Sequence, residues 1–568
     1  MTPSRHTAIQ ILKRHCLLLL FLIPMSLAGQ DVERSVETLR DRLANNPIEY
    51  SGGLSLNLRF NSISGMQRRR DPFGINLMAN ATIDILGFKA PFSIAIADRN
   101  ATYRLPAYSF VGISPSYKWI KLHLFRRSMS FSKYSLNGHG FNGAGFELTP
   151  GRFRMSAMYG TLRKARLQDF GLRQELDNFY QRKGYGVQVG YQHSGDEIML
   201  NLFRASDDET TLPAEFRETT PAKENLVTSV TLRKALGSVI SLEGEYAYSI
   251  LTAEKNFPER AFTGIAKAFD LAIDLNSTSA ASSAYNFNIK FNPGSIGAFT
   301  LGYERVNPEF VSLGTFQFQN DFENFTLGYT GRVLKKIALF GRVGIERNNL
   351  DAEERENRNR FVAQAQLSYA ISKQWTTSLS FSNFKQTTRL TDATNINEVV
   401  DSIFLGSSSN QLSLNSRYLI NESHSLSGSV SYQLANTIAR DVVTARTTEV
   451  LNFMINYQLS PKDLPYSAGL SLMYNSLSSE NINSSSFTPS ARFSYDISEQ
   501  WKASLLIMNN IGFVNSNSSG SLFRAGISSS YKVSEKQNIS LRLMSIRRNG
   551  DSRSFTEFNG FLGWSFRF

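Results

Sequence analysis

The chain has 568 residues, of which 41% are hydrophobic and 19% charged, and its formal net charge is +13. The basic residues are dispersed, and residues 68–70 form the only run of three or more, so we expect no nucleic-acid partner. The single cysteine, Cys16, excludes a disulfide framework. No segment approaches the roughly 18 consecutive apolar residues that a helical membrane span needs.

The first 28 residues have the order of charges and apolar residues that is typical of a secretion signal. Arg5, Lys13 and Arg14 are followed by the apolar residues 17–23 and by small residues that end at Ala28. The alternative is a transmembrane anchor, but the apolar run of about a dozen residues is shorter than the roughly 20 of a spanning helix. We therefore predict a signal peptide over residues 1–28, cleaved after Ala28.

Residues 29–52 form a short leader with a different periodicity. Val32, Val36, Leu39 and Leu43 recur at helical spacing among charged residues. One interpretation is a helix that lies under the mouth of the following domain as a small stopper. We favour the other interpretation, in which this periplasmic leader is a short solvated helix or a disordered segment.

From residue 53 onward, apolar and polar residues alternate in short segments. In one of them Tyr285, Phe287 and Ile289 alternate with Asn286 and Asn288. Because side chains on a strand alternate between two faces, each segment predicts a strand with one apolar and one polar face. Short turns and longer polar loops separate these segments in turn. This pattern is typical of a transmembrane barrel, whereas the alternative, a soluble antiparallel sandwich, gives no reason for the difference between turns and loops.

The number of such segments predicts the size of the barrel. Nineteen strands are predicted from Tyr185 to the end, and seven candidates precede them at residues 54–60, 75–85, 92–96, 108–113, 120–124, 141–148 and 153–159. We therefore predict an all-β fold, a transmembrane antiparallel up-and-down β-barrel of about 24–26 strands over residues 53–568, with short periplasmic turns and longer extracellular loops. An even strand number places both ends of the barrel in the periplasm.

Four of the short turns share one pattern of residues. Residues 369–375 and 495–501 both run from Tyr through Ser to Trp, and residues 531–537 and 418–424 are variants. A Ser or Asn that bonds its own backbone starts such a turn, and amphipathic rings favour the membrane–water boundary on either side. We predict an interfacial aromatic girdle that contains Tyr369, Trp375, Tyr418, Tyr457, Tyr495, Trp501 and Tyr531.

The last eleven residues alternate apolar or glycine positions with other residues and end on an aromatic ring. The positions that define the pattern are Phe558, Leu562, Trp564, Phe566 and Phe568. This strand resembles the carboxy-terminal assembly signal of gram-negative outer-membrane β-barrels. The resemblance implies that the barrel-assembly machinery reads the strand, that the protein is integral to the outer membrane, and that membrane lipid and lipopolysaccharide surround it.

The alternation breaks between residues 125 and 146, where glycines and aromatic residues are dense. Together with residues 114–119, this stretch resembles large outer-membrane barrels. Glycine permits both close approach and sharp bends, so the sequence leaves two interpretations open: a loop that folds inward and narrows the lumen, or a barrel corner. If the loop folds inward, the candidate lumen constriction contains Arg126, Arg127, Lys133, Tyr134 and His139.

A barrel of this size is too wide for side chains to fill, so its lumen must be blocked by inward loops, the leader or another protein. Predicted inward positions are Asn286, Asn288, Lys290, Thr300, Glu304, Gln364, Gln366, Ser427, Ser429, Ser431, Arg492, Arg524 and Arg542. This wall is polar and slightly basic. We expect a gated or partner-plugged pore for a polar solute or an exported polypeptide, with a plug or surface lipoprotein as a candidate partner. The alternative is a non-conducting barrel that anchors a surface or periplasmic partner.

Enzyme motifs are weak. None of His123, His139, His193 and His424 has the Ser two residues later that membrane-barrel phospholipases use, and we expect His123 to be a lumen or girdle residue. The chain also lacks a His-Glu-x-x-His motif, paired cysteines and a phosphate-binding glycine loop. We therefore expect no catalytic, cofactor-binding or metal site, and a membrane-embedded hydrolase is the least favoured function.

Overall fold

The computed structural model describes residues 48–68, 71–85, 88–97, 109–167, 178–260, 267, 269, 272–294, 296–315, 319–334, 336–353, 356–390, 403–439, 446–550 and 553–568. The predicted signal peptide and residues 29–47 of the predicted leader lie outside the described residues. Both stay predictions. No helix in the described ranges is long and apolar enough to cross a membrane.

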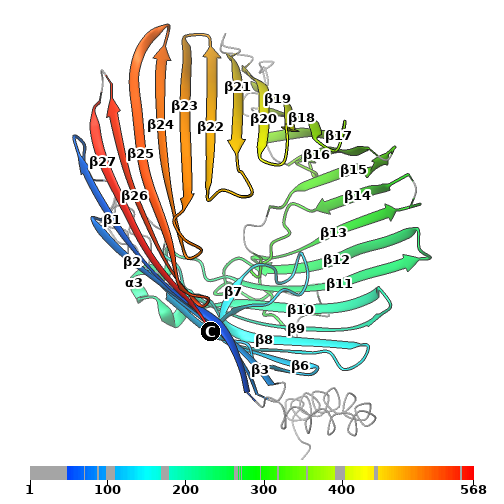
Figure 1. The fold of residues 1–568 in the computed structure, drawn as a ribbon. Helices are drawn as coiled ribbons and strands as arrows, with labels where there is room; N and C mark the ends of the chain where they lie inside the picture. The colour runs from blue at the N-terminus through cyan, green and yellow to red at the C-terminus, as the bar shows by residue number, and fades with distance from the viewer. Residues whose placement is uncertain are drawn as a thin grey trace, which may run out of the picture.

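The described residues form one antiparallel sheet that curls into a ring (Figure 1). The first strands are β1 (Ile48–Ser64), β2 (Phe73–Ile85), β3 (Phe88–Ala97), β4 (Ser109–Ile113), β5 (Ser116–Tyr117), β6 (Ile120–Ser128), β7 (Gly140–Leu148), β8 (Phe153–Arg163), β9 (Gln181–His193), β10 (Asp196–Asp208), β11 (Glu224–Leu236), β12 (Ile240–Thr252), β13 (Ser279–Phe291), β14 (Ala298–Val306) and β15 (Phe322–Val333). The loop from β10 to β11 contains the short helices η2 (Glu209–Thr211) and α3 (Ala214–Arg217).

The remaining strands are generally longer. They are β16 (Ile337–Asn348), β17 (Glu356–Ala370), β18 (Trp375–Leu390), β19 (Ile403–Leu419), β20 (His424–Ala439), β21 (Arg446–Leu459), β22 (Tyr466–Ser479), β23 (Ile482–Asp496), β24 (Trp501–Val514), β25 (Asn517–Ser534), β26 (Gln537–Asn549) and β27 (Phe555–Arg567). Several start earlier than the apolar pattern predicts; β19, for example, begins at Ile403 rather than near Leu412. Backbone pairing continues there through Ser-rich and Asn-rich sequence, because the hydrogen-bond ladder does not require apolar side chains.

Strands β4 and β5 are two pieces of one strand, since both pair with β3 on one side and with β6 on the other. Counted in this way the barrel has 26 strands, which confirms the upper end of the predicted range. All seven candidate strands before Tyr185 are present.

The barrel closes where β1 pairs with β27, in a register that runs from Gly53↔Arg567 to Ser64↔Thr556. Phe568 extends this seam by exchanging backbone hydrogen bonds with Gly52 at 3.0 and 3.2 Å. Strand β1 begins at Ile48, so residues 48–52 of the predicted leader belong to the barrel wall.

The aromatic rings of the predicted assembly signal lie along the closing seam. The rings of Trp564 and Phe566 stack with centroids 6.2 Å apart, and Phe568 lies 5.7 Å from Phe566 and 6.2 Å from Tyr50. Phe558 and Leu562 precede these rings in β27 and belong to the same alternating apolar positions. Both are exposed on the outward face. Recognition of this strand by the assembly machinery stays a prediction.

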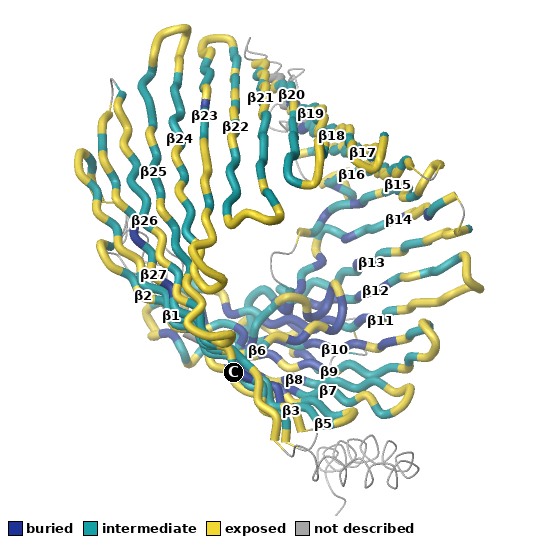
Figure 2. Tube along the Cα trace, in the orientation of Figure 1, coloured by how far each residue is buried: buried dark blue, intermediate teal, exposed yellow. Residues whose placement is uncertain are grey.

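Apolar and polar side chains alternate between the two faces of the wall, as predicted. On β22, Leu470, Leu472 and Tyr474 are exposed on the outward face and alternate with half-buried residues that include Ser471 and Asn475. Exposed large apolar residues recur on strands all around the ring, and Figure 2 shows exposed and partly buried positions alternating along many of these strands. Such a band costs free energy in water and is stable in lipid, where a closed barrel also satisfies every backbone group.

The repeated turns have the predicted chemistry. Ser372 Oγ accepts hydrogen bonds from the backbone N–H groups of Gln374 and Trp375, and Ser498 Oγ does the same for Gln500 and Trp501. In the variant turn, Asn421 Oδ1 accepts from two backbone N–H groups at 2.9 Å.

The predicted girdle residues lie at or beside these turns. Six of them are exposed on the outward face, namely Tyr369, Trp375, Tyr418, Tyr495, Trp501 and Tyr531. The indole N–H groups of Trp375 and Trp501 each donate to a serine hydroxyl at 2.8 Å. Tyr457 is half-buried, and its hydroxyl bonds His424 Nδ1. Their contact with a membrane boundary stays a prediction.

The connections at the end opposite the termini differ strongly along the chain. After β8, β10, β12 and β14 they span residues 164–180, 209–223, 253–278 and 307–321, whereas after β22 and β24 they shrink to residues 480–481 and 515–516. The predicted long loops are therefore concentrated in the first half of the wall.

Candidate functional site

The connection between β6 and β7 folds into the barrel. We call residues 129–139 the inner segment. Phe131, Tyr134 and Leu136 are buried, with exposed fractions of 8%, 1% and 0%. The wall residues that contact the inner segment alternate along β9–β14 with residues that face outward. The inner segment therefore lies against the inward face of that wall. Figure 2 shows this buried material inside the ring, beside β10–β12. Of the two interpretations left open by the sequence, the structure has the inward fold.

A buried carboxylate holds the inner segment. Glu245 on β12 is 6% exposed, and its two oxygens accept hydrogen bonds from the backbone N–H groups of Lys133 at 3.1 Å and Tyr134 at 3.4 Å. Exposed Tyr246, its neighbour, faces outward. A buried carboxylate is tolerated where N–H donors replace its water, so Glu245 and the inner segment stabilise each other.

Side-chain amides bind the first part of the inner segment. Gln188 Nε2 donates to the carbonyl oxygen of Phe131 and to Asn201 Oδ1, both at 2.8 Å. Asn201 in turn donates to Ser229 Oγ at 3.0 Å, and Ser229 bonds Ser132 Oγ at 3.0 Å. This network crosses from β9 to β11, so it ties the inner segment to three neighbouring strands.

A second inward connection, residues 309–315 between β14 and β15, lies beside the first. Ser312 Oγ donates to the carbonyl oxygen of Ser135 at 2.8 Å, and the N–H of Asn137 donates to the carbonyl oxygen of Gly314 at 3.0 Å. A Cβ at Gly314 would lie 2.4 Å from the carbonyl oxygen of Ser135, so only glycine permits this approach. Asn225 anchors this connection through Val311 and Leu313.

Apolar packing adds to these polar contacts. One buried cluster joins residues of the inner segment to the wall: Met129, Phe131, Leu136, Phe141, Met158, Leu162, Phe203 and Ala205. A second joins both inward connections to β11–β14: Tyr134, Val227, Ala247, Ala284, Val306 and Phe310. The first half of the barrel therefore has a packed interior, and its inward connections are fixed by burial as well as by hydrogen bonds.

The five predicted constriction residues do not lie together, and the structure divides them into two groups. Lys133 and Tyr134 both contact Glu304. The Glu304 carboxylate accepts a hydrogen bond from Tyr134 Oη at 2.9 Å and forms an ion pair with Lys133 Nζ. Burial raises the pKa of Tyr134, and the nearby Glu304 carboxylate raises it further. These two residues are part of the inner segment's attachment.

His139, Arg126 and Arg127 lie at the two ends of the inner segment. His139 Nδ1 bonds the carbonyl oxygen of Gly140, and burial lowers the pKa of His139, with Arg126 among the cations that lower it further. Arg127 instead donates to Ser93 Oγ at 3.1 Å and to the carbonyl oxygen of Pro91 at 3.3 Å on the neighbouring wall.

The residues that anchor the inner segment and the second inward connection were not predicted. The anchors are Gln188, Asn201, Asn225 and Glu245. Their inward direction follows from the sequence, because each alternates with residues that face outward. Nothing in the sequence pairs them with residues 129–139 or 309–315, because the partners are far apart in the chain.

The wall from β16 to β27 has a bare inward face. Beyond Asn349 the buried residues of the described ranges, glycines aside, are Thr388 and Thr488. Five arginines on this face alternate with exposed outward residues and form no ion pair with a described carboxylate: Arg342, Arg417, Arg492, Arg524 and Arg542. Among the residues that the structure describes, no group of three or more His, Cys, Asp or Glu side chains is placed to hold a metal ion.

The sequence matches no family model and no curated protein. Among solved structures, the chain is similar to the translocation pore of the P pilus usher PapC, with a TM-score of 0.35, 11% identity, and 91% of this chain and 99% of that chain covered. It is also similar to the copper transporter OprC, with a TM-score of 0.39, 9% identity, and coverage of 91% and 80%. A mutant ferric enterobactin receptor, PfeA from Pseudomonas aeruginosa, gives 0.39, 9%, and coverage of 92% and 80%.

The closed ring, the outward apolar band and the paired carboxy-terminal strand define the class of protein. The chain is a transmembrane antiparallel β-barrel of 26 strands.

Proposed function

We propose that this barrel forms a pore whose lumen the inner segment narrows and gates, and that the pore prefers anionic polar solutes. The observation that carries the gate is the attachment of the inner segment to Glu245, a buried carboxylate that accepts two backbone N–H groups. A wide barrel leaves a lumen that side chains cannot fill. A segment attached to one wall alone can detach from it without opening the barrel.

The preference for anions rests on the bare wall. Its inward side chains are mostly Ser, Asn and Gln, and Arg492, Arg524 and Arg542 lie among them without carboxylate partners in the described part of the chain. Fixed cations on a hydrated wall raise the local concentration of anions and lower that of cations.

Conductance across a planar bilayer tests the gate. Glu245→Ala removes the acceptor of two N–H groups and should give larger single-channel steps than the wild type. Glu243→Ala is the matched control, because Glu243 lies on the same strand and pairs with Arg233 rather than with the inner segment. Equal steps in both variants, and in a variant that lacks residues 130–138, would contradict the gate. An absence of steps in every variant would contradict the pore and favour the anchoring barrel.

Reversal potentials in a salt gradient test the preference for anions. Replacing Arg492, Arg524 and Arg542 together by serine should lower the ratio of anion to cation permeability. Lys462→Ser is the control, because Lys462 pairs with Glu422 in a turn outside the lumen. An unchanged ratio in the triple variant would reject the assignment of selectivity to this wall.

A further inference from the structure

The wall of the lumen contains a hydrogen-bonded chain of a serine, a histidine and a carboxylate. Ser114 Oγ lies 3.1 Å from His123 Nδ1, and His123 Nε2 lies 2.6 Å from Glu147 Oε1. Ser114 and His123 are buried, with exposed fractions of 7% and 5%. Both distances are within the range that a nucleophile and its base require. The set does not follow the His-x-Ser pattern, because the serine precedes the histidine in the chain and lies in the interruption between β4 and β5.

The break between β4 and β5 positions Ser114. Pro115 has no N–H for the ladder, and the strand is interrupted at residues 114–115. The N–H of Ser114 donates to the carbonyl oxygen of Pro91 at 2.9 Å, and Leu122 donates to that of Pro115 at 2.8 Å. These two bonds hold the interrupted strand against β3 and β6, so Ser114 faces His123 across the break.

Regular pairing of β6 with β7 positions the other two groups. Lys121 pairs with Glu147 and His123 with Gly145, so His123 and Glu147 are diagonal neighbours on one face. Leu122 and Leu124 are exposed on the opposite, outward face. His123 and Glu147 therefore point into the lumen, and Lys121 forms an ion pair with Glu147 at 3.1 Å.

When the imidazole is neutral, its two partners select one tautomer. An ionised carboxylate only accepts hydrogen bonds, so Nε2–H of His123 donates to Glu147. Nδ1 of the neutral ring is then the acceptor, and the hydroxyl of Ser114 donates to it. This arrangement leaves the imidazole ready to take the proton of Ser114, while Glu147 orients the ring and stabilises the imidazolium that forms.

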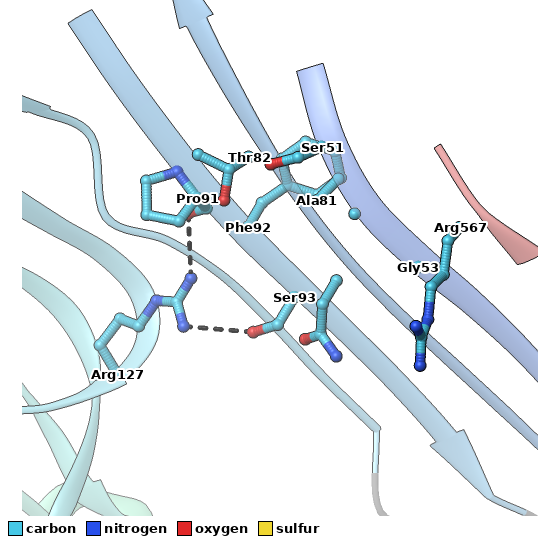
Figure 3. Close-up of a pocket in the computed structure, with 11 residues that line it drawn as sticks. Ser51, Gly53, Ala81, Thr82, Pro91, Phe92, Ser93, Arg127 and Arg567 are labelled. Carbon is cyan, nitrogen blue, oxygen red and sulfur yellow. Dashed lines mark hydrogen bonds between the residues drawn. The ribbon is translucent and has the colours of Figure 1, made fainter. Parts of the chain in front are cut away.

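The site lies between the inner segment and an open recess. A Cβ at Gly145, the partner of His123, would lie 2.6 Å from Met129 Sδ, so the first residue of the inner segment covers this part of the wall. Pro91, which bonds Ser114, also lines a recess of about 510 Å³ with Ser93, Arg127 and Arg567 (Figure 3). The guanidinium of Arg127 bonds Pro91, Ser93 and Gly112, which fixes a positive charge beside the Ser114 backbone, and its Nε has no acceptor.

We propose that Ser114, His123 and Glu147 form a lumen-facing acyl-transfer site that hydrolyses short-chain carboxylic esters. Ser114 Oγ attacks the ester carbonyl while its proton moves to His123 Nδ1, and the fixed positive charge of Arg127 favours the carbonyl oxygen as it becomes negative. The bond to the alcohol breaks, and the departing oxygen takes the proton from His123. Water then attacks the acyl-serine by the same proton transfers, which releases the acid and restores Ser114. Water is the only co-reactant.

Covalent labelling of the full-length, detergent-folded barrel tests the site. The protein is incubated with a fluorophosphonate probe, and the modified residue is located by peptide mass spectrometry. We expect an adduct on Ser114 of the wild type, turnover of p-nitrophenyl acetate, and loss of both in Ser114→Ala. Ser116→Ala, a nearby serine outside the hydrogen-bonded chain, should keep both. An unmodified Ser114 in the folded wild type would overturn the proposal without reference to any variant.

Two further variants separate catalysis from a structural role. His123→Asn should lower the labelling rate by about 10²-fold, the usual contribution of a general base. Glu147→Gln keeps an acceptor for the ring but loses the charge, so the maximal labelling rate should fall while the probe concentration for half-maximal rate stays the same. Unchanged rates in both variants would overturn the assignment. Glu245→Ala should still be labelled, so this test and that of the pore can fail independently.

Discussion

The walls β6–β15 and β16–β27 share one alternating pattern but differ in what covers their inward faces. In the first, two inward connections pack against the strands and bury residues such as Phe141, Phe203 and Phe310 completely. In the second, the inward face is largely uncovered, and the connections after β22 and β24 have two residues each. Lipid therefore stabilises both walls from outside, and only the first also has a protein core on the inside.

The largest effect should come from emptying that core. Phe141→Ala removes a fully buried ring that packs in the cluster with Leu136 and Phe203, and it should lower the free energy of unfolding by about 3–5 kcal/mol. Phe523→Ala, on the outward face of β25, leaves no internal cavity and should cost much less. Chemical denaturation of the folded barrel in vesicles measures both. Equal losses would erase the distinction between the walls.

In the bare wall, the sensitive face should be the outer one. Leu541→Arg places a charge in lipid and should cost about 2–4 kcal/mol if Leu541 lies near the bilayer midplane. Ser540→Arg, one residue earlier, directs the same side chain into the lumen and should cost far less. The same denaturation experiment compares the two, and similar values would mean that the assigned facing of β26 is wrong.

A smaller effect is expected at the hydroxyl of Tyr134. Tyr134→Phe removes its bond to Glu304, which Lys133 still neutralises, so the loss of unfolding free energy should be about 1 kcal/mol. Tyr329→Phe is the control, because its exposed hydroxyl bonds the carbonyl oxygen of Ile296 and water can replace it. A Tyr134 variant as stable as the control would show that this contact adds nothing to the inner segment.

The smallest effect is a dependence of stability on pH. Burial lowers the pKa of His139, so the unfolded chain binds a proton more readily than the folded one. Stability should therefore fall as the pH drops below the ordinary histidine pKa of about 6.5, and should level off below the folded value. His139→Gln should flatten this part of the stability curve. A curve of unchanged shape would assign the dependence to another group.

The strands of the barrel wall could be predicted because the sequence pattern that defines each strand is local. Alternation within a dozen residues sets which face of β22 or β26 meets lipid, and a Ser or Asn at a turn bonds residues two or three positions away. The strand number of 26 could be predicted by counting the segments that have this local pattern. The interruption at Ser114 and Pro115 and the early start of β1 at Ile48 were not predicted, since neither changes the apolar pattern.

The lumen site could be predicted only in part, because its contacts are remote. Glu245 bonds the backbone of Lys133, which is 112 positions away, and Ser312 bonds Ser135 across 177 positions. Single residues such as Lys133 and Tyr134 could be selected from the break in alternation. Their partners depend on which strands are neighbours in the finished barrel, and one sequence does not contain that information.

The seam between β1 and β27 has a consequence for the order of events during biogenesis. Strand β1 pairs with β2 on one side, so its other edge and the outer edge of the growing sheet stay open to other chains until β27 arrives. A truncated product would keep those edges permanently and would be recognisable as unfinished. Because β1 and β27 close the ring, only a chain that contains every strand from β1 to β27 pairs both of these edges.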